Sequence, residues 1–147
     1  MKRTTTIACF LILATCLALI TSGEASAKTP SSSRPVRIKF IQGAISTQVR
    51  GHLTMNKNAD AFYVIKAKVG DHMIVNIISL TSGLMTGGDV TSPSGEQDGQ
   101  HGGIIFNDDL TETGDYTIRV ARNLMGTERA DGSFILEIVI TSSYLKN

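Results

Sequence analysis

The sequence predicts an all-β protein: a single antiparallel β-sandwich of the jelly-roll or Greek-key kind, with about eight strands. From residue 36 onward, apolar residues alternate with polar ones over short segments, which is the period of a half-buried strand. Clusters of Gly, Pro, Asn and Asp separate these segments, as turns do. No window shows a 3.6-residue period bounded by helix caps.

The predicted strands of the first half differ in how they are buried. Residues 36–40 and 48–53 alternate apolar and polar positions, as strands with one buried face do. Residues 62–68 are rich in β-branched and aromatic side chains and end at the turn Gly70-Asp71. Residues 73–79 are nearly all apolar, which predicts a strand buried on both sides.

In the second half, residues 89–92, 104–110 and 116–121 are predicted strands that lie between turns. Residues 133–141 place Phe, Leu and Ile on one face, which predicts a further strand. Residues 83–103 hold seven glycines and one proline. We expect one short strand there, flanked by long loops, and long loops on a rigid sheet often carry function.

The start of the chain has the three parts of a secretory signal peptide. Lys2-Arg3 is a basic start, Ile7–Ile20 is largely apolar, and Ala25-Ser26-Ala27 is a cleavage signal. The apolar run is shorter than the roughly 20 residues that a membrane-spanning helix needs, so no membrane anchor is predicted. We therefore expect a signal peptide over residues 1–27 with cleavage after Ala27, and a flexible linker over residues 28–35. A sandwich domain over residues 36–147 follows, in a protein that is periplasmic or secreted.

Composition excludes several classes of function. Both cysteines, Cys9 and Cys16, lie in the leader, so the expected mature chain has no disulfide and no thiol nucleophile. Without Lys2, Arg3 and Glu24, 12 of the 14 basic and 12 of the 13 acidic residues remain, a net charge of zero. Aromatic residues make up 5% and Trp is absent. This composition argues against a nucleic-acid partner and against an aromatic sugar-binding platform.

The charges are segregated along the chain. Residues 28–68 contain eight basic residues and a single acid, Asp60, whereas residues 69–118 contain eight acids and no Lys or Arg. Opposite charges that pair across neighbouring strands would explain this distribution. An acidic face that meets a basic partner would explain it as well. Pairing is the simpler interpretation, and the sequence leaves both open.

Residues typical of catalytic and metal sites are sparse. His52, His72 and His101 are not at the spacing of zinc ligands, and Ser94 lacks the Gly-x-Ser-x-Gly context of a hydrolase nucleophile. His101 lies in the glycine-rich segment 98–103, where a bound metal or phosphate is a minor alternative to a plain loop. We predict a protein that is not an enzyme and uses no cofactor. Four acids are weak candidates for calcium ligands, and the simpler interpretation is that they are hydrated turn residues: Asp89, Asp98, Asp108 and Asp109.

The turn Thr113-Gly114-Asp115-Tyr116 belongs to a wider pattern. It is preceded by two other turn motifs, Gly70-Asp71 and Val90-x-x-Pro93-x-Gly95. An Asp-x-Tyr motif is usual before them, and here two residues instead of one separate the acid from the tyrosine, in Asp60-Ala61-Phe62-Tyr63. In this order the motifs resemble the pre-peptidase C-terminal type of domain, a small β-sandwich of secreted bacterial proteins. The resemblance covers residues 36–140.

Among such domains, the chain looks like the periplasmic inhibitors of goose-type (g-type) lysozyme. The likeness is carried by the opening strand and turn over residues 36–46, and by the late turn with Arg119-Val120 and Arg122-Asn123 after it. Thr113 stands where related inhibitors have Ser, which keeps a hydroxyl. The resemblance implies an exported inhibitor whose exposed loop occludes the cleft of a lysozyme and so protects peptidoglycan. The partner-binding residues that it implies are Thr113, Gly114, Asp115, Tyr116, Arg119 and Arg122.

Two alternatives accompany this hypothesis. Tyr116 has either a partner-binding role at the loop tip or a packing role in which its hydroxyl ties the turn down. The alternative function is a binding module for an extracellular polymer such as collagen or chitin, with or without calcium.

Overall fold

The computed structural model describes residues 34–55, 60–123 and 131–142, and within these ranges the chain forms nine strands and no helix. The predicted signal peptide and nearly all of the predicted linker lie outside the described residues. No helix long and apolar enough to cross a membrane occurs in the described ranges. The strands are β1 (Val36–Arg37), β2 (Ser46–Leu53), β3 (Ala61–Ala67), β4 (His72–Ser79), β5 (Thr86–Thr91), β6 (Gln97–His101), β7 (Gly103–Asp109), β8 (Gly114–Arg122) and β9 (Gly132–Thr141).

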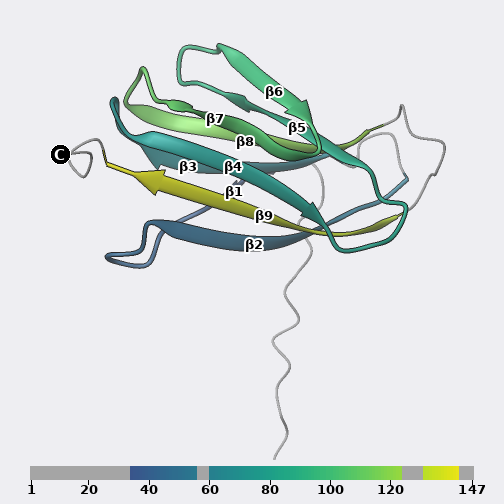
Figure 1. The fold of residues 1–147 in the computed structure, drawn as a ribbon. Coiled ribbons are helices and arrows are strands. Elements are labelled where there is room, and N and C mark those ends of the chain that lie inside the picture. The colour runs from purple at the N-terminus through teal and green to yellow at the C-terminus, as the bar shows by residue number, and fades with distance from the viewer. Residues whose placement is uncertain (1–33, 56–59, 124–130, 143–147) are drawn as a thin grey trace, which may run out of the picture.

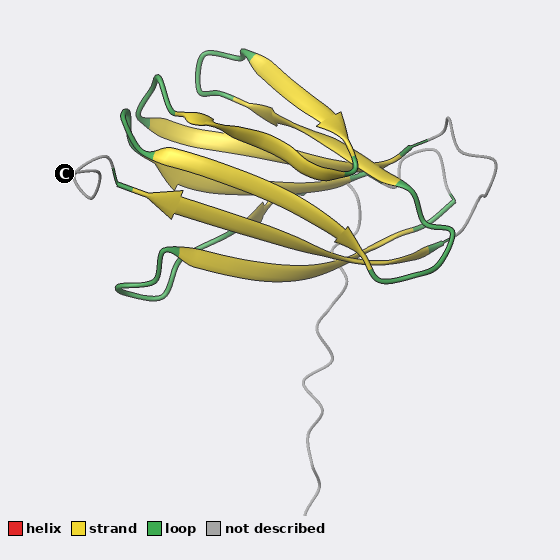
Figure 2. Ribbon diagram, in the orientation of Figure 1, coloured by secondary structure: helices red, strands yellow, loops and turns green. Residues whose placement is uncertain are grey.

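The strands form two sheets that pack face to face (Figures 1 and 2). One sheet has five strands in the order β1-β3-β8-β5-β6, and the other has four in the order β2-β9-β4-β7. All neighbours pair antiparallel except β1 and β3, which are parallel. The predicted class, an all-β antiparallel sandwich, is confirmed.

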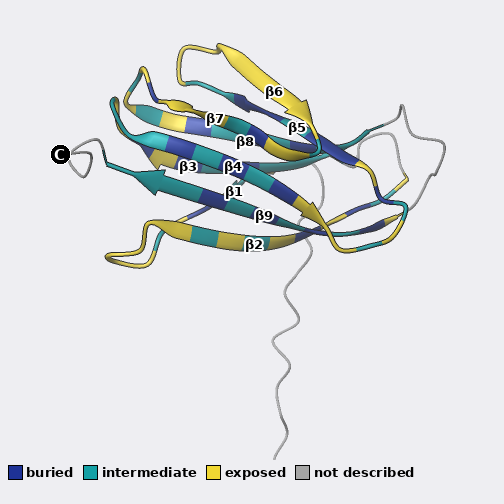
Figure 3. Ribbon diagram, viewed as in Figure 1, coloured by how far each residue is buried: buried dark blue, intermediate teal, exposed yellow. Residues whose placement is uncertain are grey.

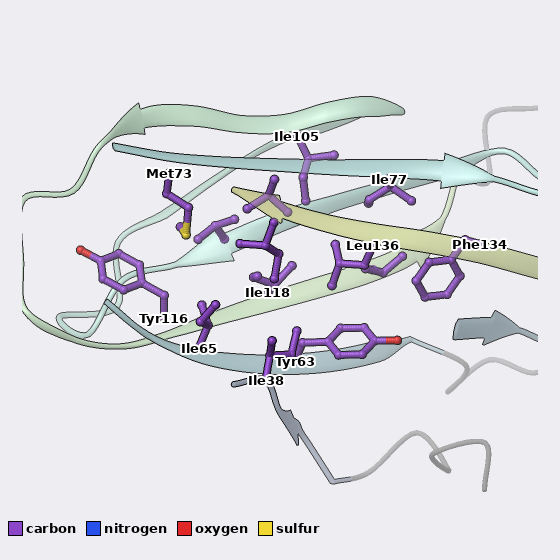
Figure 4. Packing of buried hydrophobic residues seen from close by; sticks show 14 of the residues in the cluster. Ile38, Tyr63, Ile65, Met73, Ile77, Ile105, Tyr116, Ile118, Phe134 and Leu136 are labelled. Carbon is purple, nitrogen blue, oxygen red and sulfur yellow. The ribbon is translucent and has the colours of Figure 1, made fainter. Parts of the chain in front are cut away.

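The core fills the space between the sheets, because each strand turns alternate side chains inward (Figures 3 and 4). In β9, for example, Phe134, Leu136 and Ile138 are fully buried and alternate with partly exposed residues. Tyr63 and Phe134 meet across the sheets edge to face, with ring centroids 6.4 Å apart. The largest fully buried side chains are Tyr63, Phe134, Leu53, Ile65, Met73, Ile105, Ile118, Leu136, Ile138, Val75 and Val120.

The glycine-rich segment differs from its prediction. It contains β5 and β6, two strands rather than one, and β5 lies inside a sheet, between β8 and β6. Gly88 explains why a glycine suits this strand: a Cβ there would lie 2.3 Å from the carbonyl oxygen of Arg119 and 2.9 Å from Cδ1 of Ile105. Glycine in a strand thus marks close packing in this protein, not a loop.

Candidate functional site

The turn before β8 is held from inside by Tyr116. This side chain is 3% exposed. Its hydroxyl donates to the carbonyl oxygen of Glu112 at 3.0 Å and accepts from the backbone N–H of Glu112 at 3.2 Å. Burial raises the pKa of this phenol above its usual range. Of the two roles considered for Tyr116, the structure shows the packing role, and it places the phenol in the core rather than at the loop tip.

Thr113 and Asp115 lie at the surface of the same turn, and both have internal partners. Thr113 Oγ1 accepts a hydrogen bond from the backbone N–H of Val69 at 2.9 Å, which ties this turn to the one between β3 and β4. The Asp115 carboxylate accepts two hydrogen bonds from the Arg37 guanidinium, at 2.5 and 2.9 Å. The Arg37 guanidinium lowers the pKa of Asp115, and the charge of Lys66 adds to this effect.

Gly114 occupies a position where a side chain has no room. A Cβ on Gly114 would lie 2.7 Å from Cγ of Pro93. The turn that contains Pro93 therefore packs directly on the start of β8. Residues 111–116, the turn at Glu112 together with the first three residues of β8, form a braced surface feature that is fixed by contacts to neighbouring turns and to β1.

Arg119 lies on the outer face of the five-stranded sheet and bridges two acids. Its Nε donates to Asp89 Oδ2 at 2.6 Å and its Nη1 donates to Asp60 Oδ2 at 3.1 Å. These carboxylates raise the pKa of the guanidinium, with the hydrogen bond to Asp89 as the largest cause. Asp89 is only 7% exposed, and Arg119 is its ion-pair partner.

Arg122 is at the far end of β8, where its Nη2 donates to the carbonyl oxygen of Met55 at 3.3 Å. Together with Arg119 it borders a shallow groove of about 520 Å³ that runs over β5, β6 and β8. Seven residue steps separate Asp115 from Arg122, about 24 Å at a strand rise of roughly 3.4 Å per residue. The structure therefore divides the predicted partner-binding residues between a turn at one end of β8 and an outer-face groove at the other.

Three of the four candidate calcium ligands, Asp98, Asp108 and Asp109, border one cleft, whereas Asp89 lies elsewhere. Asp89 lies under Arg119 on the outer face of its sheet, and the cleft is at the edge of the sandwich. Asp109 Oδ1 lies 2.6 Å from Nδ1 of His72. Among the residues that the structure describes, no group of three or more His, Cys, Asp or Glu side chains is arranged to hold a metal ion.

A cleft of about 450 Å³ opens between the sheets at the edge formed by β6 and β7, a feature that the sequence analysis missed. These strands follow one another in the chain but belong to different sheets. The apolar part of its lining comes from Val90, Phe106 and Leu110, and Tyr116 lies beside them. The remaining lining includes Ser92, Gln97, Thr111 and four acids, with no Lys or Arg: Glu96, Asp98, Asp108 and Asp109.

The structure divides the acids of segment 69–118 into two groups: the pairing interpretation is confirmed for one, and the other lines the cleft. Asp89 and Asp115 pair with arginines across the five-stranded sheet. Glu96, Asp98 and Asp108 border the cleft, and none of them makes an ion pair within the described ranges. The one signal in the sequence that could have located the cleft was the absence of Lys and Arg from this segment.

With this geometry established, the chain can be compared with known proteins. No protein-family model matches it, and no curated protein matches its sequence. Among solved structures, it is similar to PliG of Aeromonas hydrophila, a periplasmic inhibitor of g-type lysozyme, with a TM-score of 0.58 and 23% identity over 73% of this chain and 96% of that one. PliG of Salmonella Typhimurium matches with a TM-score of 0.54 and 16% identity, over 74% of this chain and 98% of that one.

The pre-peptidase C-terminal domain of a collagenase from Bacillus anthracis is similar as well. Its TM-score is 0.54 at 15% identity, over 71% of this chain and 94% of that domain. The chain has the fold that these proteins share. The resemblance seen in the sequence is thus confirmed at the level of the fold. These neighbours comprise two periplasmic lysozyme inhibitors and a domain of a collagenase.

Proposed function

We propose that this protein is exported and inhibits a lysozyme, with the g-type favoured, by binding it and covering its active-site cleft. The observation that carries the proposal is the match to PliG, because the sandwich covers 96% and 98% of two PliG chains. The leader predicted from the sequence agrees with the periplasmic location of those inhibitors. Such a protein would protect peptidoglycan in the periplasm or outside the cell.

The turn at residues 111–116 supports inhibition by occlusion. Thr113 and Asp115 are exposed, while Tyr116 fixes the backbone beneath them. A turn that is already ordered loses little conformational entropy when it binds, which favours a tight complex. Arg119 and Arg122 lie on another part of the surface and provide a secondary contact region.

Lysis of a peptidoglycan suspension, measured by turbidity, tests the proposal. Goose-type, chicken-type and invertebrate-type lysozymes are each assayed with and without the purified protein. We expect protection against the goose-type enzyme at the lowest concentration of protein. Undiminished lysis by all three enzymes would reject the proposed function.

A variant tests whether the turn at residues 111–116 makes the contact. Thr113→Val combined with Asp115→Asn removes a hydroxyl and a charge from the exposed side, and we expect the inhibition constant to rise about tenfold or more. Asp131→Asn is the control, because Asp131 is exposed and precedes β9 at the opposite end of the sandwich. Equal inhibition by both variants would move the contact elsewhere without removing the inhibitor function.

The similarity to the collagenase domain favours a second candidate, a module that binds an extracellular polymer. Calorimetry with collagen and chitin, each with and without calcium, distinguishes the two. A saturable isotherm with a polymer, in a protein that inhibits no lysozyme, would favour this second function.

A further inference from the structure

The cleft between β6 and β7 has acids on both walls. In the five-stranded sheet, Asp98 is paired in register with Val90, and in the four-stranded sheet Asp108 is paired with Met73. Residues directly opposite on neighbouring antiparallel strands share a face, and both Val90 and Met73 are buried in the core. Asp98 and Asp108 therefore project from opposite sheets into the space between them.

The floor of the cleft is apolar and includes an aromatic ring. Val90 and Leu110 are almost fully buried, and Phe106 is half-buried on the β7 wall. A long side chain with an apolar stem and a charged head matches such a floor and rim. A bare metal ion does not, because no three acidic or histidine groups in the described ranges converge on one point.

The charged residues on the edge strands of the described ranges are polarised in the same direction. The strand orders place β1, β2 and β3 toward one edge, and β6 and β7 at the other (Figure 1). Basic residues lie on and beside the first edge, where Arg37, Lys39, Arg50 and Lys66 are found, while Glu96, Asp98 and Asp108 lie at the second. A basic group is thus attracted to the cleft edge and repelled from the opposite one.

We infer that this cleft is a receptor for an arginine side chain of a protein partner; that the partner is a lysozyme rests on the proposed function. Arginine fits better than lysine for two reasons. Its planar guanidinium can stack on an aromatic ring, and Phe106 lines the cleft; its forked N–H groups can reach two carboxylates at once. In this contact the partner inserts a side chain into this protein. At residues 111–116 the reverse is proposed, because there this protein covers the cleft of the partner.

Titration of the isotopically labelled protein with small probes, followed by amide NMR shifts, tests the cleft without any lysozyme. The probes are the blocked amino acids N-acetyl-arginine, N-acetyl-lysine and N-acetyl-norleucine N-methylamides. We expect the arginine probe to shift the amides of residues 96–98 and 106–111, with weaker binding at higher salt. The lysine probe should bind several-fold more weakly at the same residues, and the norleucine probe should leave them unshifted.

Three variants assign the interaction. The acid-cleft variant combines Asp98→Asn with Asp108→Asn. It should bind the arginine probe about tenfold or more weakly, because two charge-assisted hydrogen bonds are lost. Phe106→Leu keeps an apolar floor and should weaken arginine more than lysine. Asp131→Asn with Glu137→Gln changes the net charge by the same amount, and Glu137 lies on the outer face of the four-stranded sheet, so this control should bind like the parent.

The outcomes separate this inference from the proposed function. Absence of cleft shifts, or equal binding by the acid-cleft variant and its control, overturns the inference even if the protein inhibits a lysozyme. In that case the inward acids serve only to protect exposed edge strands from pairing with other chains, and the acid-cleft variant should aggregate more. Cleft binding in a protein that inhibits no lysozyme leaves the arginine receptor intact and removes only the proposed partner. If the protein does inhibit, the acid-cleft variant should raise the inhibition constant about tenfold relative to its control.

Discussion

The ring of Tyr63 packs in the apolar core, but the core offers its hydroxyl no hydrogen-bond partner among the described residues. Tyr63 is 1% exposed. Burial raises the pKa of the phenol to about 12. A buried polar group without a partner destabilises the folded state, so removing the hydroxyl oxygen should not lower the free energy of unfolding.

We therefore predict that Tyr63→Phe leaves the free energy of unfolding unchanged or raises it by about 1 kcal/mol. The folded pKa lies above the ordinary value of 10.0, so below pH 10 the phenol is un-ionised in both the folded and the unfolded state. As the pH rises from 10 toward 12 the phenol ionises in the unfolded state first, which lowers the free energy of unfolding, and the variant should lack this loss. Urea unfolding at neutral and alkaline pH measures the difference. A variant that is less stable at neutral pH would show that the hydroxyl has a partner in solution.

Tyr116 contrasts with Tyr63, because its hydroxyl satisfies both backbone groups of Glu112. Tyr116→Phe should lower the free energy of unfolding by about 1 kcal/mol, whereas Tyr116→Ala should lower it by about 3–5 kcal/mol because it also leaves a cavity. Thermal unfolding of the two variants checks this order. Similar small losses in both would mean that the ring is not packed in the core as described.

At the scale of the element, Arg119 connects β8 to β5 and to the residue before β3. Replacement by Met keeps the stem and removes the charge, which leaves the nearly buried Asp89 unpaired. Because the Arg119 side chain is 41% exposed, solvent reduces the effect, and we expect a loss of about 1–2 kcal/mol. Adding Asp89→Asn to Arg119→Met should recover part of the loss. Strictly additive losses in this double-mutant cycle, followed by urea unfolding, would show that the pair is not coupled.

The elements also show how far the sequence could be interpreted. β3, β4, β8 and β9 were predictable as strands because their side chains alternate or are largely apolar. The expectation that residues 73–79 are buried on both sides was wrong, because only alternate side chains of β4 face the core and Ile78 is 40% exposed. β6 was not, because all five of its residues are polar or glycine and all are exposed. It is a strand only because its backbone pairs with β5, a partner that no local pattern reveals.

The candidate site was only partly predictable for the same reason. Thr113–Tyr116 has a local turn signature, but the chain bends earlier, at Glu112, and β8 begins at Gly114. The burial of Tyr116 and the distance from that turn to Arg122 depend on packing between strands far apart in the chain. The cleft arises where consecutive strands β6 and β7 join different sheets, so no single segment of sequence contains it.

At the scale of the whole molecule, separated charge affects how a partner approaches. The expected mature chain has no net charge, yet in the described ranges several basic residues lie on or beside β1, β2 and β3, and acids without an ion pair lie at the β6–β7 edge. Such a distribution orients a basic partner before contact and speeds association, and salt screens it within about 10 Å at 0.1 M.

We predict that association with a g-type lysozyme, measured by stopped-flow mixing, slows by about tenfold or more from low to high salt while dissociation changes little. Asp98→Asn with Asp108→Asn should flatten this dependence, because it removes charge from the edge that we propose faces the partner. Asp131→Asn with Glu137→Gln should retain the parental slope despite the same change in net charge. If both variants flatten the dependence equally, net charge alone governs the approach. A rate that does not respond to salt in the parent protein would place the contact on a surface where opposite charges already cancel, such as the face where Arg119 bridges Asp60 and Asp89.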